Sequence, residues 1–276
     1  MSSPLSARYR TAFVTGASTG LGLAFTDMLL AAGVEVWGTS RDPARLPARA
    51  GLHAIALELG DGPAAERAFL DAEKAAGGFD LVINNAGFGA FGTFVHTDFA
   101  VWEEQLRMML VNTARLTHAA LRGMLARRRG ALVNISSIAG EFGMPYQAVY
   151  NTTKAGLSAL NESLMYEVKG TGVIIIDFRP GDFRTDFEGS VRRPTQTGAD
   201  AVQSDRMARV WRNFTAMMQS GPPPAQAAAD LQAALLRGRS GTVRTGRFFQ
   251  AVLAPFLARL GSLALKRRIQ EKYFGL

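Results

Sequence analysis

The sequence TGASTGLG, at residues 15–22, stands between a short apolar run, TAFV at residues 11–14, and a segment with helical periodicity. Glycines in such a turn let the backbone bend tightly and let main-chain N–H groups approach a phosphate, whose charge then lies at a helix N-terminus. The spacing is GxxxGxG and differs from the GxGxxG of the common dinucleotide fingerprint. The position between a strand and a helix favours a nucleotide site over an ordinary turn. Its candidate residues are Gly16, Ser18, Thr19, Gly20, Leu21 and Gly22.

Short apolar runs alternate with longer amphipathic segments from residue 11 to residue 179, which is typical of βαβ units. We predict strands at residues 11–15, 35–40, 53–59, 81–84, 131–136 and 173–178, and a further one at 242–245. Helices are expected at residues 20–32, 63–76, 102–128 and 148–169. This pattern predicts the α/β class: a Rossmann-like, doubly wound parallel sheet with helices on both faces, followed by a C-terminal helical substrate lid. We expect a single domain over residues 1–276.

Composition restricts the classes of function. The chain has 31 Lys and Arg, 23 Asp and Glu, a net charge of +8, 3 His and no Cys. Disulfides, thiolate catalysis and cysteine zinc sites are therefore excluded, and we expect no metal. The positive charge is spread along the chain without aromatic interleaving, so we expect solvated surface and no nucleic-acid partner; a binder of membranes or DNA is a third-ranked hypothesis.

The rhythm of strands and helices stops after Pro180. Residues 183–224 show no strand pattern but contain a helical stretch at 205–219 whose large apolar side chains share one face. That face either packs on the core or forms a lid over an apolar substrate. The members of the stripe are Met207, Trp211, Phe214, Met217 and Met218.

The end of the second predicted strand bears on cofactor choice. An acidic residue there would bind the adenosine ribose 2′-OH and select NAD. Ser40 holds that position instead, and Arg41 adds a positive charge suited to a 2′-phosphate. The stretch therefore favours NADP(H). Asp42 is the competing acid, but just before Pro43 it is also a typical helix N-cap, which is the interpretation we favour.

Two more groups of polar residues follow predicted strands. NNAG at residues 84–87 ends the fourth strand at the edge where ligands bind in such sheets, and contributes Asn85, Ala86 and Gly87. Ser137 ends the fifth strand, and Tyr150 and Lys154 follow on a helix, four residues apart and so on one face. A nearby ammonium lowers the pKa of a phenol, which could then exchange a proton with an alcohol or a carbonyl oxygen.

Together, these motifs resemble the short-chain dehydrogenase/reductase family over roughly residues 11–185, with its TGxxxGxG, NNAG, Ser…YxxxK and PGxxxT patterns. The resemblance implies that Tyr150 is the general acid/base and that Lys154 holds the nicotinamide ribose and lowers the Tyr150 pKa. Ser137 would orient the carbonyl, and Asn112 would hold a water in a proton relay. In the PGxxxT stretch, Thr185 would bond the nicotinamide carboxamide.

The remaining cofactor residues also follow from the resemblance. Phe183 stands where an aliphatic residue is usual, beside Pro180 and Gly181. Glu58 and Leu59 occupy the places of an Asp and an aliphatic residue that contact adenine.

We therefore expect an NADP(H)-dependent oxidoreductase that interconverts a carbonyl and a secondary alcohol. The alternative is an NADP(H)-binding sensor or scaffold without turnover. Aromatic and Met side chains of residues 88–94, 142–144 and 183–224 favour a small-molecule carbonyl or alcohol substrate that is apolar: steroid, retinoid, fatty or aromatic. Arg184, Arg192 and Arg193 leave phosphorylated or carboxylated substrates open.

The tail at residues 247–276 is apolar and basic, and it is similar to the C-terminal ends of steroid- and retinol-type members. It could lie on an anionic membrane as a peripheral contact, cover the active site or pack on another subunit. The family's usual assembly implies a homodimer or homotetramer through the helices at 102–128 and 148–169. Because no signal peptide or membrane span is visible, we expect a cytoplasmic protein.

Overall fold

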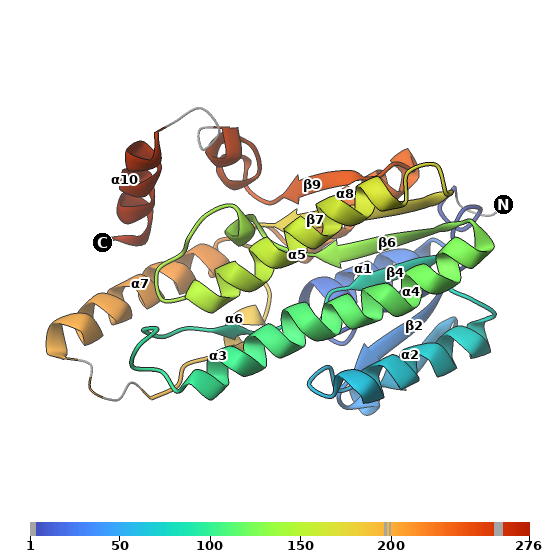
Figure 1. The fold of residues 1–276 in the computed structure, drawn as a ribbon, viewed down its shortest axis with the longest axis horizontal. Helices are drawn as coiled ribbons and strands as arrows, with labels where there is room; N and C mark the ends of the chain where they lie inside the picture. Colours follow the sequence, from blue (N-terminus) through green and yellow to red (C-terminus); the bar gives the residue numbers. More distant parts are fainter. Residues whose placement is uncertain (1–3, 196–197, 199, 257–261) are drawn as a thin grey trace.

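A seven-stranded parallel sheet organises the chain in the computed structural model, which describes residues 4–195, 198, 200–256 and 262–276. Its strands run in the order β3-β2-β1-β4-β6-β7-β9, so the chain starts near the middle and winds outward first to one edge and then to the other (Figure 1). The predicted doubly wound Rossmann-like fold is confirmed, including the seventh strand. The strands are β1 (Thr11–Val14), β2 (Glu35–Ser40), β3 (Leu52–Ala56), β4 (Leu81–Asn84), β6 (Gly130–Ile135), β7 (Val173–Pro180) and β9 (Gly241–Thr245).

Helices cover both faces of the sheet. Because successive side chains of a strand point to opposite faces, Val14 packs in the core beneath α1 and α8, whereas Phe13 packs in the core beneath α2 and α4. Strands buried on both sides read as continuous apolar runs, which explains why they were recognisable in the sequence. The covering helices are α1 (Gly20–Ala31), α2 (Gly62–Ala76), α4 (Thr113–Arg127), α5 (Ala148–Glu167) and α8 (Pro224–Arg237). No described helix is long and apolar enough to cross a membrane.

The structure corrects three details of the predicted elements. The single helix expected at residues 102–128 is α3 (Phe99–Leu106), a π-helical segment (Arg107–Asn112) and α4. A π-helical turn absorbs one more residue than an α-turn, and apolar periodicity does not reveal it. β3 ends at Ala56, before the predicted residues 57–59. In the segment expected to lack strands, α6 (Phe187–Ser190) leads into β8 (Val191–Arg192), which pairs with β5 (Gly89–Ala90).

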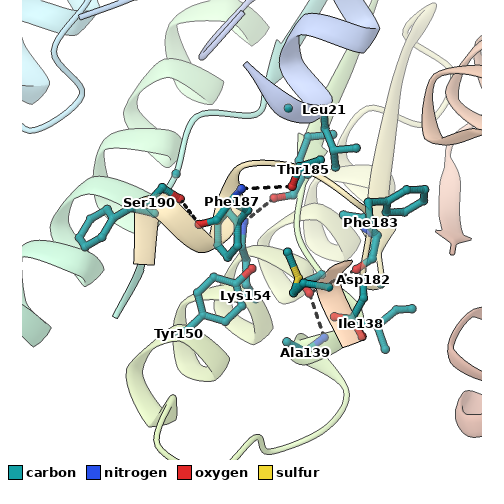
Figure 2. A pocket seen from close by; sticks show the side chains of 18 of the residues that line it. Leu21, Ile138, Ala139, Tyr150, Lys154, Asp182, Phe183, Thr185, Phe187 and Ser190 are labelled. Carbon is teal, nitrogen blue, oxygen red and sulfur yellow. Dashed lines mark hydrogen bonds between the residues drawn. The ribbon is translucent and has the colours of Figure 1, made fainter. Parts of the chain in front are cut away.

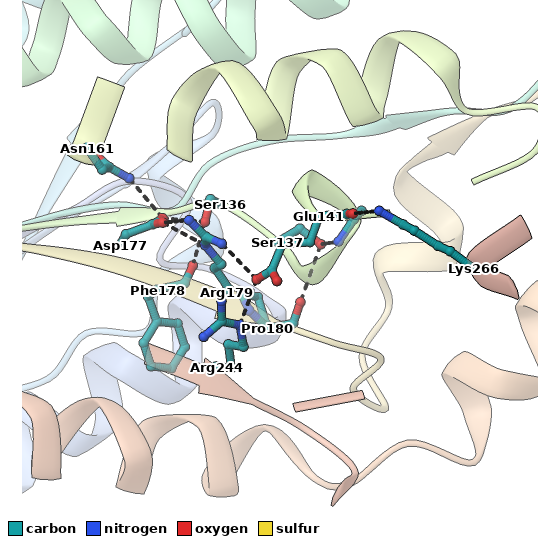
Figure 3. A network of polar contacts seen from close by, with 11 residues as sticks. Ser136, Ser137, Glu141, Asn161, Asp177, Phe178, Arg179, Pro180, Arg244 and Lys266 are labelled. Carbon is teal, nitrogen blue, oxygen red and sulfur yellow. Dashed lines mark hydrogen bonds and ion pairs between the residues drawn. The ribbon is translucent and has the colours of Figure 1, made fainter. Parts of the chain in front are cut away.

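Buried amides cross-link the sheet and the helices on the carboxyl side of the strands. The Asn84 side chain donates to Asn134 Oδ1 at 2.8 Å, and the Asn134 amide donates to Asn161 Oδ1 at 2.6 Å. Asn161 then donates to Asp177 Oδ1 at 3.0 Å (Figure 3). Each amide is buried, so each would lose its partners at a cost if one member were removed.

We expect Asn161→Ala to lower the free energy of unfolding by roughly 2–4 kcal/mol, because it leaves Asn134 and Asp177 each short of a buried hydrogen bond. Urea denaturation measures the change. Glu162→Ala, at the exposed next position of α5, is the control and is expected to shift stability by less than about 0.5 kcal/mol. Equal effects of the two substitutions would contradict a structural role for the amide chain.

Candidate active site

The glycine turn after β1 is held in shape by the NNAG segment after β4. Thr15 Oγ1 accepts from the main-chain N–H groups of Asn85 at 2.8 Å and Ala86 at 2.9 Å, and the Asn85 amide donates to the Thr15 carbonyl at 2.9 Å. A Cβ at Gly22 would lie 2.0 Å from the Gly16 carbonyl oxygen, so this close turn requires glycine there. Gly16 also has a φ of +67°, in the left-handed region that favours glycine.

A cavity of about 790 Å³ runs along the carboxyl edge of the strands, beside this turn. It collects nearly all predicted site residues from both halves of the sheet. Gly22 and Asn112 are the exceptions: both are buried, and neither lines the cavity. The predicted residues that line the cavity are Gly16, Ser18, Thr19, Gly20, Leu21, Ser40, Arg41, Glu58, Leu59, Asn85, Ala86, Gly87, Ser137, Tyr150, Lys154, Pro180, Gly181, Phe183 and Thr185.

The end of the cavity near β2 is basic. Arg41 and Arg45 both line it, and Arg45 was not singled out from the sequence. Asp42 does not compete for a ribose: its carboxylate accepts from Ala44 N–H at 3.0 Å and caps the short helix that follows, as predicted. The Glu58 carboxylate accepts from the main-chain N–H of Gly60 at 2.9 Å. Two guanidinium groups beside a glycine turn therefore fit a nucleotide with an additional phosphate.

Tyr150, Lys154 and Ser137 meet at the centre of the cavity (Figure 2 shows the first two). Lys154 Nζ lies 5.7 Å from the centroid of the Tyr150 ring and donates to the Ile135 carbonyl at 2.7 Å. The Ser137 hydroxyl accepts from Ala139 N–H at 3.0 Å, which fixes it at the end of β6. The hydroxyl also donates to the Pro180 carbonyl at 3.3 Å, and it lies close enough to Tyr150 to influence the pKa of the phenol. The helical spacing of four therefore produces the predicted cluster.

The expected lowering of the Tyr150 pKa is not observed in this structure. Burial raises the pKa of Tyr150 to about 12, against the opposing effect of the nearby Ser137 hydroxyl. Burial also lowers the pKa of Lys154 to about 8, although the nearby Asp177 carboxylate favours its charged form. The ammonium that was expected to stabilise the phenolate is thus itself poorly solvated, and the prediction overlooked this cost.

Asp177 anchors the elements around the cluster. Its carboxylate accepts from the Ser136 hydroxyl, from Asn161 at 3.0 Å and from Arg179 Nε at 2.7 Å (Figure 3). Arg179 continues to Glu141 at 2.7 Å. Burial alone would raise the pKa of Glu141, but hydrogen bonds from Arg244 and Arg179 lower it overall. None of these acids and arginines was singled out in the sequence, because Glu141, which follows β6, meets Arg179 of β7 and Arg244 of β9 only in the folded chain.

The side chain of Asn112 does not join the Tyr150 cluster. Its amide donates to the Leu59 carbonyl at 2.7 Å, so it ties the end of the π-helical segment to the loop after β3. The Asn112 amide nitrogen is therefore already engaged with the main chain. The water relay through Asn112 stays a prediction. Phe183, the unusual aromatic of the PGxxxT stretch, is buried in the core that α1 and α8 cover.

Apolar side chains line the substrate end of the cavity, opposite the basic end. Phe214, Met217 and Met218 come from α7 (Ala201–Gln219), and the same helix packs on Phe91. The two interpretations of this helix therefore coincide, since one face serves both the core and the cavity. Of the other predicted pocket residues, Phe88, Phe142, Met144 and Phe187 also line the cavity, whereas Phe91, Phe94 and Trp211 do not.

The tail also contributes to the cavity wall. α10 (Leu263–Phe274) crosses over the loop after β6, where Lys266 Nζ donates to the Glu141 carbonyl at 2.7 Å and Gln270 donates to the Gly143 carbonyl at 3.0 Å. Of the three positions considered for the tail, this is the one over the active site. Leu257 and Leu260, which belong to its apolar pattern, lie outside the described residues. The tail residues Phe249, Gln250, Ala254, Leu265, Lys266, Ile269, Gln270, Tyr273 and Phe274 line the cavity and were not predicted as site residues.

Comparison with known proteins agrees with this geometry. Residues 10–196 match the short chain dehydrogenase family. The 3-oxoacyl-(acyl-carrier-protein) reductase FabG of Aquifex aeolicus is 33% identical over 187 residues, which cover 64% of this chain and 75% of that protein. A short-chain dehydrogenase from Streptomyces avermitilis superposes with a TM-score of 0.81 at 28% identity and 95% and 96% coverage. A metagenomic short-chain oxidoreductase in complex with NADP has a TM-score of 0.67 at 26% identity, with 88% and 99% coverage.

The lowered pKa of Lys154 predicts how stability changes with pH. Below pH 8 the lysine is protonated in both the folded and the unfolded chain, and the folded state bears the full cost of the buried charge. Between pH 8 and pH 10.5 the folded state has lost this proton while the unfolded state keeps it, so the cost declines as pH rises.

Urea denaturation of the wild type and of Lys154→Met at pH 7.5 and pH 9.5 tests this. The wild type should gain about 1–2 kcal/mol relative to Lys154→Met over that range. Parallel pH profiles for the two proteins would show that Lys154 has an ordinary pKa.

Proposed function

Because the chain belongs to the short-chain dehydrogenase family, we propose that it is an NADP(H)-dependent oxidoreductase that interconverts a carbonyl and a secondary alcohol. The observation that carries this proposal is the position of Tyr150, beside Lys154 and in the same cavity as Ser137 and the glycine turn. The family likeness and the glycine turn support a nicotinamide cofactor, as does the complex of the metagenomic relative with NADP.

The reacting groups have distinct tasks in this proposal. The cofactor, when bound, supplies the hydride from carbon 4 of its nicotinamide ring, or accepts it at that carbon in the reverse direction. Ser137 and Tyr150 hydrogen-bond the carbonyl oxygen, and Tyr150 donates its proton as negative charge develops there. Lys154 holds the nicotinamide ribose. Thr185, two residues before α6, binds the nicotinamide carboxamide.

Preference for NADP(H) rests on the basic end of the cavity. Arg41 and Arg45 line it, Ser40 occupies the position where an acid would select NAD, and Asp42 is engaged as a helix cap. A guanidinium pair suits a 2′-phosphate by charge and by geometry. NADH would leave this basic end without its counter-charge.

The apolar end supports a fatty, aromatic, steroid or retinoid substrate. α7 and α10 present Met, Phe and Leu side chains there, and together they act as the substrate lid. The FabG relative is named as a reductase of a 3-oxoacyl group, which also supports a ketone. The second candidate, a sensor or scaffold without turnover, is separated by activity: it would bind NADPH and reduce nothing.

Assembly and location are further parts of the proposal. Val111, Leu125 and Tyr166 expose apolar side chains around α4 and α5, which supports a homodimer or homotetramer through these helices. Phe248, Val252 and Phe256 are exposed in the basic tail, which supports peripheral contact with an anionic membrane. The protein would otherwise be cytoplasmic. Light scattering and salt-dependent sedimentation with anionic vesicles test the two surfaces separately.

Tyr150→Phe should lower kcat for NADPH-dependent ketone reduction by at least ~10²–10⁴-fold, because it removes the proton donor. NADPH binding, followed by fluorescence titration, should stay close to that of the wild type. Retained turnover in this variant would assign proton donation to another group.

Arg41→Ala should raise the Kd for NADPH by about tenfold, the value of a charge-assisted hydrogen bond, and leave the Kd for NADH nearly unchanged. Arg209→Ala, at an exposed position of α7, removes the same charge far from the basic end and is the control. Equal weakening of both cofactors by Arg41→Ala would contradict the assignment of Arg41 to the 2′-phosphate.

A further inference from the structure

The substrate end of the cavity contains a carboxylate, that of Asp182, which the proposed reaction does not use. Asp182 follows Gly181 in the PGxxxT stretch and lines the cavity together with Gln250 and Tyr273 of the tail. We propose that Asp182 is a subsite for a protonated amine on the substrate, so that the preferred substrates are amphipathic amino ketones or the corresponding amino alcohols. This inference rests on the proposed function and specifies its substrate class.

The tail holds Asp182 in place through hydrogen bonds. Gln250 Oε1 accepts from Asp182 N–H at 3.1 Å, and Gln250 Nε2 donates both to the Asp182 carboxylate and to Tyr273 Oη, the latter at 2.9 Å. A Cβ at Gly181 would lie 2.5 Å from Gln250 Oε1, so the glycine permits this close packing. The carboxylate is thus a fixed group in the cavity wall rather than a mobile surface acid.

The Asp182 charge has no cation directly against it. None of the ion pairs found between described residues includes Asp182. Arg247 acts on it through its charge, but the Arg247 guanidinium donates to the Ser220 carbonyl. Burial raises the pKa of Asp182, which shows that its ionised form is poorly solvated. A cationic group on a ligand would stabilise the ionised carboxylate of Asp182.

Asp182 also lies within electrostatic reach of the reacting phenol, since its charge helps to raise the pKa of Tyr150. Both side chains border the same pocket in Figure 2. An ammonium bound to Asp182 would therefore stand close to the carbonyl that Tyr150 holds. Apolar side chains also line this end of the cavity, among them Ile269, Phe274 and Met218. The walls together match a molecule with one cationic group near its carbonyl and an apolar remainder.

Asp182 could instead serve only to anchor the tail, and Asp182→Asn separates the two roles. The asparagine keeps an oxygen that accepts from Gln250, so the anchor persists while the negative charge is lost. Asp205→Asn, at an exposed position of α7, makes the same change of net charge away from the cavity and is the matched control. Thermal melts of both variants report whether the anchor is intact.

The kinetic experiment compares NADPH-dependent reduction of 1-aminodecan-2-one, its N-acetyl derivative and decan-2-one. The wild type and Asp205→Asn should show a kcat/KM at least about tenfold higher for the amine than for either neutral ketone. In Asp182→Asn the ratio of kcat/KM for the amine to kcat/KM for the neutral ketones should fall by about tenfold, a ratio in which any effect of the lost charge on Tyr150 cancels. The same preference in Asp182→Asn, or none in the wild type, would overturn the subsite.

A binding experiment keeps the test independent of turnover. Octylamine and octan-1-ol are titrated calorimetrically into the protein with NADPH present, and octylamine should bind at least about tenfold more tightly, but not to Asp182→Asn. If this difference holds and no ketone is reduced, the subsite stands and the proposed reaction fails. If ketones are reduced while octylamine has no Asp182-dependent advantage, the reaction stands and the subsite is wrong.

Discussion

The carboxylate of Asp177 is buried at the point where β6, α5 and β7 come together. It accepts from Ser136 after β6, from Asn161 of α5 and from Arg179 of its own strand β7, and its charge favours the protonated form of Lys154. A buried acid of this kind is stable only while its partners remain in place. The same set of contacts therefore fixes Ser137 at the end of β6, Tyr150 and Lys154 on α5, and the PGxxxT stretch after β7.

A second constraint operates across the sheet. The glycine turn after β1 keeps its shape through Thr15 and Asn85, so the nucleotide end of the cavity depends on the pairing of β1 with β4. The order β3-β2-β1-β4-β6-β7-β9 places this turn and the Asp177 network on either side of the same crevice. Ser137, Tyr150 and Lys154 lie between them, and α7 and α10 contribute further residues to the cavity wall. The sheet topology therefore also determines the shape of the cavity, because the carboxyl ends of the strands form its edge.

The sequence predicted most of the fold because the inner strands, such as β1, β4 and β6, are buried on both faces and read as apolar runs between helices of clear periodicity. It predicted that Tyr150 and Lys154 lie side by side, because two residues four apart on a helix share a face and no contact between distant parts of the chain is needed. It did not predict the π-helical segment before Asn112, since one additional residue in a turn leaves the apolar pattern almost intact. Nor did it reveal Arg45, Gln250 or Tyr273 as cavity residues, or the raised pKa of Tyr150, because these depend on burial and on contacts between distant parts of the chain.

The most direct test of the proposed carbonyl reduction uses NADPH labelled with deuterium at carbon 4 of the nicotinamide and an apolar ketone. Mass spectrometry of the alcohol shows whether the deuterium has been transferred. The alcohol should carry deuterium at its carbinol carbon, because Tyr150 and the glycine turn border the same cavity and would hold the ketone beside the cofactor. Tight binding of the labelled cofactor with no deuterated alcohol from ketones with or without an amino group would contradict the proposed reduction, and would identify the cavity as a binding site without turnover.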